Sequence, residues 1–267
     1  MDLSDKVVIL TGASRGIGRA AAHRFAGAGC KVALVARSTE LLNELAAGLG
    51  PERALALPAD VGDPEACDRL VAQTTARFGG VDILVNNAGV GINGPGVTAS
   101  LNDLHRVMQV NYFGPLHLIR ACAPQFKQRG GGLVINVSSI VGRRSVPWSA
   151  GYCASKGALE RLVESLRIEL AADNIRFCTL YPGLTRTNFT PHALGLPRQP
   201  RERIKGVSAD RAAAKLVRAA QKEPRDAFVT LFDRLFVSAS RMFPGPVDAV
   251  FRWYFKETHP LPGGSNE

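Results

Sequence analysis

Residues 6–18 read KVVILTGASRGIG, a short apolar run followed by three glycines. The run at 6–10 predicts a buried strand, and the pattern after it predicts a helix. Gly12 permits a tight turn, Gly16 lets the backbone approach a pyrophosphate, and Gly18 lets helix and strand pack closely. The amides at the helix start then favour a negative group. The stretch therefore predicts a dinucleotide-binding turn, although its Gly-x-x-x-Gly-x-Gly spacing differs from the commoner Gly-x-Gly-x-x-Gly.

The alternation of strand and helix continues along the whole chain. Short, nearly continuous apolar runs predict seven strands, at residues 6–10, 31–35, 54–57, 81–85, 133–137, 175–181 and 227–231. Helical patterns lie between them, for example at 17–28, 64–78 and 152–172. This order predicts an α/β, doubly wound (Rossmann) parallel seven-stranded sheet with helices on both faces. Because no linker or change of composition interrupts it, we expect a single domain, residues 1–231, with a C-terminal helical extension, 232–267, packed on it.

Composition excludes several classes of protein. The chain has 267 residues, 46% of them apolar, and 33 Lys plus Arg against 23 Asp plus Glu, a net charge of +10. This apolar fraction argues against a disordered chain. We expect neither a membrane-spanning helix nor a secretory signal at residues 1–6. Five dispersed cysteines indicate buried thiols rather than a disulfide framework or a metal site, and hence a cytoplasmic protein.

The end of the second predicted strand bears on the choice of cofactor. An NAD site usually has a carboxylate there, but this chain has Ala36-Arg37-Ser38. Arg37 and Arg15 together match a 2′-phosphate, which favours NADP(H) over NAD(H), unless both are ordinary surface arginines. Asp60 and Val61 end the third predicted strand and are expected to contact the adenine, although a plain loop aspartate is the simpler alternative.

Tyr152 and Lys156 lie four residues apart in a predicted helix, so they share one face. An ordinary tyrosine has a pKa of about 10, too high for efficient proton exchange near neutrality. A cation within about 4–6 Å lowers such a pKa by roughly 1–3. The pair therefore suits acid–base chemistry at a carbonyl, whereas an aromatic ring packed beside a lysine stem is the simpler alternative.

Other motifs accompany this pair and decide between the two readings. Ser138 and Ser139 end the fifth predicted strand at the edge where doubly wound sheets bind ligands. Asn111 falls within the helix that follows the fourth strand. In this combination the chain resembles the classical short-chain dehydrogenase/reductases over nearly its whole length. The matching elements are 11–18, 86–89, Asn111, Ser139, 152–156 and Pro182-Gly183.

The resemblance implies a catalytic tetrad. Tyr152 would be the acid/base, Ser139 would hydrogen-bond the substrate oxygen, Lys156 would hold the ribose and lower the pKa of Tyr152, and Asn111 would fix a water. Together with the arguments above, it implies cofactor-binding residues Gly12, Ser14, Arg15, Gly16, Ile17, Gly18, Arg37, Asp60, Val61, Asn87, Ala88, Gly89, Tyr152, Lys156, Pro182, Gly183 and Thr185.

The C-terminal residues depart from the family pattern. A first apolar stripe comprises Phe232, Leu235, Phe236, Ala239, Met242 and Phe243. We expect Pro244-Gly245-Pro246 to break that helix before a second stripe of Val247, Val250, Phe251 and Tyr254. Three interpretations stay open: the stripes complete the core or a subunit contact, cap an apolar pocket, or lie on a membrane surface with nearby basic residues.

The expected function is NADP(H)-dependent hydride transfer between nicotinamide and a carbonyl or secondary alcohol, with a bulky apolar substrate favoured. The alternative is a non-catalytic NADP-sensing or scaffold protein on the same fold. The basic residues form no recognised nucleic-acid motif, so no nucleic-acid partner is expected. By family analogy we expect a homodimer or homotetramer, with peripheral membrane contact as an option. Specificity is expected to come from residues 91–100, 143–150 and 184–207, and 183–206 is predicted to be a flexible loop beside the site.

Overall fold

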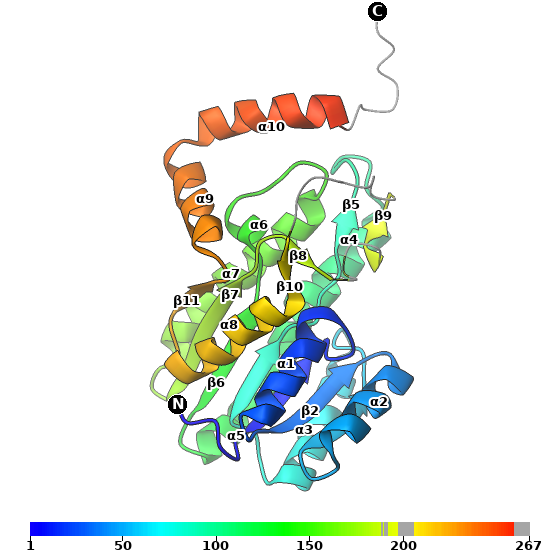
Figure 1. Ribbon diagram of the computed structural model, residues 1–267, viewed down its shortest axis with the longest axis vertical. Helices are drawn as coiled ribbons and strands as arrows, with labels where there is room; N and C mark the ends of the chain where they lie inside the picture. The colour runs from blue at the N-terminus through cyan, green and yellow to red at the C-terminus, as the bar shows by residue number, and fades with distance from the viewer. Residues whose placement is uncertain (188, 190–191, 197–205, 259–267) are drawn as a thin grey trace, which may run out of the picture.

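The computed structural model describes residues 1–187, 189, 192–196 and 206–258, with side chains described up to 255. Seven parallel strands form one sheet in the order β11-β7-β6-β4-β1-β2-β3 (Figure 1). They are β1 (Val7–Thr11), β2 (Lys31–Ala36), β3 (Ala54–Pro58), β4 (Ile83–Asn86), β6 (Gly132–Val137), β7 (Ile175–Tyr181) and β11 (Asp226–Phe228). Each overlaps a predicted run, and the doubly wound fold is confirmed.

Helices cover both faces of this sheet and create two layers of core. One layer contains α1 (Gly16–Gly27), α2 (Thr39–Leu49) and α8 (Ala209–Lys222), and the other contains α3 (Pro64–Phe78), α5 (Gly114–Gln128) and α7 (Ala150–Glu169). Within β1, Val8 and Leu10 join the first layer and Ile9 joins the second. Both faces of the strand are therefore buried, which explains its continuous apolar run.

Local sequence signals determine where α3 begins and ends. The Asp63 side chain accepts a hydrogen bond from the N–H of Glu65 at 3.0 Å, and Pro64 occupies the first helical position. Gly79 ends the helix with a φ of +85°. The predicted bounds of this helix are confirmed because both caps are encoded by adjacent residues.

Several short elements lie beyond the carboxyl ends of the strands. They are α4 (Leu101–Met108), the π-helical turn η1 (Gln109–Phe113), α6 (Ile140–Arg143), and the strand pairs β5 (Ile92–Asn93) with β9 (Leu194–Gly195) and β8 (Thr185–Arg186) with β10 (Val207–Ser208). The predicted loop at 183–206 thus contains two short strands, and its residues 188, 190–191 and 197–205 lie outside the described residues.

The C-terminal residues form α9 (Leu231–Met242) and α10 (Pro244–Thr258), which lead away from the sheet at one end of the molecule (Figure 1). The interpretation that the first stripe completes the core is wrong, because Phe232, Leu235 and Met242 are exposed. The predicted break at Pro244-Gly245-Pro246 is confirmed: α9 ends at Met242 and Pro244 begins α10, since proline is tolerated in a first helical turn. Among the described residues, no helix is both long and apolar enough to cross a bilayer.

Candidate active site

The turn between β1 and α1 has glycines that its geometry requires. Gly12 and Gly16 have φ values of +64° and +54°, and a Cβ atom on Gly18 would lie 2.0 Å from the Gly12 carbonyl oxygen. Arg15 is the residue before α1 and has extended backbone. Its side chain makes no hydrogen bond to the first amides of the helix, and the first turn contains no acidic residue. Ile17 packs against the core. The uncapped amides and the close backbone approach fit the diphosphate of a dinucleotide.

Asn87 and Ala88, which follow β4, form hydrogen bonds with the start of this turn. The Asn87 amide donates to the carbonyls of Thr11 at 2.8 Å and Gly12 at 3.2 Å. The Thr11 hydroxyl accepts from the N–H groups of Asn87 and Ala88, both at 2.9 Å. Sequence reasoning assigned Thr11 no role of its own, and a polar residue closing an apolar strand is the signal that points to it.

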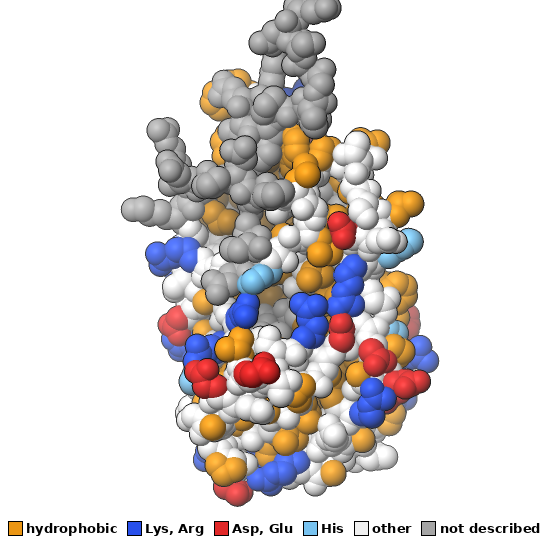
Figure 2. Space-filling model, turned by 90° about the vertical axis from the view of Figure 1, so that its right-hand side faces the viewer, with side chains coloured by type: hydrophobic (Ala, Val, Ile, Leu, Met, Phe, Trp, Pro, Cys, Tyr) orange, Lys and Arg blue, Asp and Glu red, His pale blue; other side chains and the backbone are white. Residues whose placement is uncertain are grey.

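Basic side chains surround the outer part of the turn. Arg15 and Arg37 are both exposed, and the Arg15 guanidinium lies 2.7 Å from Nε2 of His192. Ser14, between the glycines, is partly buried. Lys and Arg side chains gather in the middle of the face in Figure 2, beside a His side chain. The sequence-predicted arginines therefore lie where an anionic group can reach them.

Asp60 has two protein partners near the end of β3, and its contact with the adenine stays a prediction. Its carboxylate accepts from the N–H of Gly62 at 2.9 Å and pairs with Arg106. Burial opposes ionisation of Asp60, but these two partners and the charge of Arg37 outweigh it and lower its pKa. Asp60 thus stabilises the loop after β3. The Val61 side chain is buried, so only its backbone is left to meet a ligand.

The hydroxyl groups of Ser139 and Tyr152 lie close together. Ser139 lies between β6 and α6, close enough to Tyr152 in the first turns of α7 for its hydroxyl to lower the pKa of that phenol. Ser139 Oγ also donates to the Pro182 carbonyl at 3.4 Å and accepts from the N–H of Val141 at 3.3 Å. Burial raises the pKa of Tyr152, and the Ser139 hydroxyl acts in the opposite direction. The phenol is therefore protonated at neutral pH.

Lys156 lies one turn further along α7, and only 3% of its surface is exposed. Its Nζ donates to the Val137 carbonyl at 2.9 Å and lies 5.9 Å from the centre of the Tyr152 ring. Burial lowers the pKa of Lys156 to about 8, with Glu160 opposing this change. In this structure burial raises the pKa of Tyr152 and Ser139 lowers it, while the lowering of that pKa by Lys156 stays a prediction.

Asn111 lies in the π-helical turn rather than in a regular helix. Its side chain is fully buried, donates to Val90 O at 2.8 Å and Ser155 Oγ at 2.9 Å, and accepts from Val90 N–H at 2.9 Å. A Cβ atom on Gly89 would lie 3.2 Å from Asn111 Oδ1 and 3.6 Å from Lys156 Nζ. Asn111 therefore joins the loop after β4 to α7, and π turns often mark functional sites. Sequence reasoning did not single out Ser155.

The residues after β7 connect the glycine turn with Tyr152. A Cβ atom on Gly16 would lie 3.2 Å from the Thr187 side chain, and the Phe189 ring centre lies 5.6 Å from that of Tyr152. The Thr185 hydroxyl donates to the carbonyl of Gly183 at 3.2 Å. This segment therefore lies over both ends of the candidate site.

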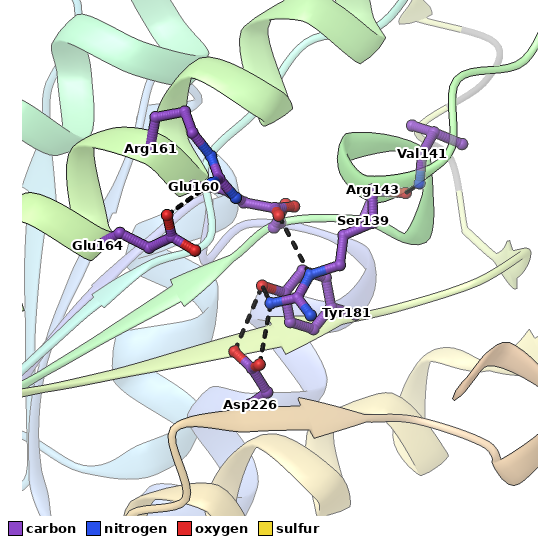
Figure 3. Close-up of polar contacts among 9 residues, drawn as sticks. Ser139, Val141, Arg143, Glu160, Arg161, Glu164, Tyr181 and Asp226 are labelled. Carbon is purple, nitrogen blue, oxygen red and sulfur yellow. Dashed lines mark hydrogen bonds and ion pairs between the residues drawn. The ribbon is translucent and has the colours of Figure 1, made fainter. Parts of the chain in front are cut away.

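A buried ionic network adjoins the tetrad (Figure 3). Glu160 accepts from Ser138 Oγ at 3.0 Å and from Arg143 Nε at 3.2 Å. Arg143 also donates to Asp226 Oδ2 at 2.9 Å and to the Tyr181 hydroxyl. Burial raises the pKa of Glu160, whereas Ser138 and Arg143 lower it. Sequence reasoning missed this network because its members are far apart in the chain, with only the spacing of Glu160 four residues after Lys156 as a local signal.

The candidate residues thus form one continuous region from the glycine turn to Tyr152, with Asn111, Ser139 and Lys156 around the phenol. Pro182, Gly183 and Thr185 follow β7 directly beside Ser139. Among the described residues, no cluster of His, Cys, Asp and Glu could hold a metal ion.

Comparison with known proteins agrees with this geometry. A family model described as short chain dehydrogenase matches residues 6–194. A fatty acyl-CoA reductase of Mycobacterium tuberculosis is 37% identical over 230 residues, covering 84% of this chain and 76% of that protein.

Two crystal structures of similar proteins contain different cofactors. A short chain dehydrogenase from Burkholderia cenocepacia in complex with NADP has a TM-score of 0.81 at 26% identity, covering 94% of this chain and 99% of that one. A short chain dehydrogenase/reductase from Burkholderia phymatum in complex with NAD has a TM-score of 0.83 at 25% identity, covering 91% and 95%. These neighbours support a nicotinamide dinucleotide without choosing between its two forms.

Proposed function

Since the chain belongs to the short chain dehydrogenase family, we propose that it is an NADP(H)-dependent oxidoreductase that interconverts a carbonyl compound and a secondary alcohol. The proximity of the Ser139 hydroxyl to the phenol of Tyr152, with Lys156 on the next turn of α7, carries this proposal. It places a proton donor beside a second hydroxyl that can bind the same substrate oxygen.

Each residue of the tetrad has its own role in the proposed reaction. A bound nicotinamide supplies or accepts the hydride. Tyr152 donates a proton to the substrate oxygen in reduction and removes it in oxidation, while Ser139 hydrogen-bonds that oxygen. Lys156 holds the ribose, and Asn111 keeps the loop after β4 against α7. Tyr152 is protonated at neutral pH, as a group that donates a proton must be, and the Ser139 hydroxyl lowers its pKa against the effect of burial, which favours proton transfer.

Replacing the phenol tests this assignment directly. Tyr152→Phe is expected to retain NADPH binding and to lose turnover by about 10²–10⁴-fold, the usual contribution of a general acid. Turnover is followed as NADPH absorbance over a panel of carbonyl compounds. Tyr112→Phe is the matched control, because Tyr112 lies in η1 with its ring against Phe113. Equal turnover by the wild type and Tyr152→Phe would refute the role of Tyr152. Tight NADPH binding without turnover of any compound would favour a non-catalytic sensor or scaffold.

The preference for NADP(H) rests on Arg15 and Arg37 and on the absence of a carboxylate directly after β2. Guanidinium groups match the 2′-phosphate that distinguishes the two cofactors. Fluorescence titration should give a loss of about tenfold or more in NADPH affinity for Arg37→Gln, with NADH affinity unchanged. Arg19→Gln is the control, because Arg19 lies at the start of α1, close to the glycine turn, but pairs with Glu44. Equal weakening of both cofactors would exclude a 2′-phosphate role for Arg37.

A bulky apolar substrate is the second part of the proposal. Phe189 packs beside Tyr152, and a Cβ atom on Gly151 would lie 2.4 Å from Leu104 and 3.2 Å from Ile92. Apolar side chains therefore lie beside the Tyr152 ring and around the residue that precedes it, and a similar protein is named for acting on fatty acyl-CoA. In the carbonyl panel, long-chain aldehydes and ketones should have a higher kcat/KM than their short-chain analogues.

A further inference from the structure

We propose that helices α9 and α10, called here the arm, form a docking surface for a membrane that contains anionic phospholipid. The starting observation is the exposure of large apolar side chains. Within the described part of the chain, half of the exposed large hydrophobic residues belong to the arm: Leu231, Phe232, Leu235, Met242, Phe243, Val250 and Trp253. A concentration of exposed large apolar side chains in one segment is typical of a protein or membrane contact.

The polar face of α9 is the one that packs on the protein, which directs the apolar face outward. Asp233 is buried and forms a capping box with Thr230, with bonds of 3.0 Å in both directions. A Cβ atom on Gly183 would lie 2.0 Å from the Asp233 carboxylate, so the helix start lies against the segment after β7. Val237 and Ser240 continue this buried face. The outward direction of Phe232 and Leu235 is therefore fixed by polar contacts.

The arm is also held at α10. Asp248 pairs with Arg144, whose guanidinium lies 5.4 Å from the centre of the Phe251 ring. The rings of Phe236 and Phe251 lie 6.4 Å apart and join the two helices. The exposed side chains thus belong to an arm with several defined contacts.

The charges on the arm favour an anionic lipid surface as its partner. Arg234, Arg241 and Arg252 are exposed among the apolar residues, whereas the carboxylates within residues 231–255 are occupied, Asp233 by its cap and Asp248 by Arg144. Apolar and aromatic side chains interspersed with arginines match an anionic lipid surface, where the rings enter the headgroup boundary and the cations meet phosphate groups. A second copy joined arm to arm would instead bring like charges together.

Co-sedimentation of the full chain with vesicles tests the proposal. We expect binding to phosphatidylcholine vesicles with about a third phosphatidylglycerol, weaker binding at high salt, and little binding to phosphatidylcholine alone. The double variant Phe232→Ser/Trp253→Ser should bind at least about tenfold more weakly. Arg234→Gln/Arg241→Gln should bind more weakly to the anionic vesicles, by about fivefold for each charge.

Ile168→Ser is the matched control, because Ile168 is 80% exposed and lies near the end of α7, outside the arm. Its vesicle binding should equal that of the wild type, and the melting curves of all variants should coincide. The proposal is overturned by an absence of vesicle binding, by equal binding of the arm variants and the wild type, or by a salt-insensitive interaction. Sedimentation that reveals dimers in the wild type and monomers only in the arm variants, without vesicle binding, would assign the surface to a second copy.

Discussion

Helices α1 and α9 are each 12 residues long, yet they bury different kinds of side chain. Helix α1 buries Gly18, Ala21, Ala22 and Phe25 against the sheet, whereas α9 buries Asp233, Val237 and Ser240 and exposes Phe232, Leu235 and Met242. Strands on both sides of α1 belong to the same sheet, so the connection forces its apolar stripe onto the core. Within the residues that the structure describes, α9 has such a strand only before it. An apolar stripe therefore predicts that a helix face will be covered. The topology decides whether the sheet of the same chain or another surface covers it.

The largest difference between the two helices should be in stability. Phe25→Ala removes a ring with 0% exposure and is expected to lower the free energy of unfolding by about 3–5 kcal/mol. Phe232→Ala, at 74% exposure, should change it by less than about 0.5 kcal/mol. Urea unfolding measures both. Equal destabilisation by the two substitutions would mean that the aromatic face of α9 is covered within the protein.

A buried and an exposed charged residue should also differ in their contribution to stability. Glu160→Leu leaves Arg143 without its buried partner and should cost about 3–5 kcal/mol of unfolding free energy. Arg241→Gln on the arm should be nearly neutral, because this residue is exposed. Thermal melts of both variants test this contrast. A melting temperature close to that of the wild type for Glu160→Leu would show that the network contributes little to stability.

The stability of the protein should depend on pH through the buried side chain of Lys156. The pKa of Lys156 falls from an ordinary 10.5 to about 8 in the folded state, so the unfolded chain binds this proton more tightly. The contribution of Lys156 is therefore unfavourable below pH 8 and becomes less so as the pH rises toward 10.5. At about 1.4 kcal/mol per tenfold difference in proton affinity, the wild type should gain up to roughly 3 kcal/mol relative to Lys156→Met over this range.

Urea titrations at a series of pH values measure this difference, and subtracting the variant removes the shared titrations of other groups. Arg252→Met, on the exposed arm, is the control and should follow the wild type in parallel. A flat difference between the wild type and Lys156→Met from pH 8 to 10.5 would contradict a lowered pKa for Lys156.

The smallest expected effect comes from two glycines. Gly18→Ala forces a methyl group against the Gly12 carbonyl and should cost about 1–3 kcal/mol of unfolding free energy and weaken cofactor binding. Gly245→Ala, in the first turn of α10, meets no atom within 4 Å and should be neutral or slightly stabilising. Denaturant midpoints and cofactor titration distinguish them. Unchanged cofactor affinity in Gly18→Ala would weaken the assignment of this turn.

Much of the candidate site was predictable because its signals are local. Asn87, Ser139 and Tyr152 each follow or adjoin a recognisable strand or helix, and parallel strands bring their carboxyl ends to one edge. The sequence did not predict the π-helical turn at Asn111 or the partnership of Glu160 with Arg143. Both depend on contacts between elements that are distant in the chain, such as Asn111 with Ser155 and Arg143 with Asp226.

By itself, the sequence determined the strand–helix alternation, the glycine turn and the identity of the groups available for acid–base chemistry. These follow from steric rules and side-chain periodicity within a few neighbouring residues. Only the tertiary structure decided that the phenol of Tyr152 is buried near Ser139 with a raised pKa, and that Phe232, Leu235 and Met242 of α9 point outward. Solvation and packing are properties of surfaces that meet in space, and the chain brings those surfaces together only when it folds.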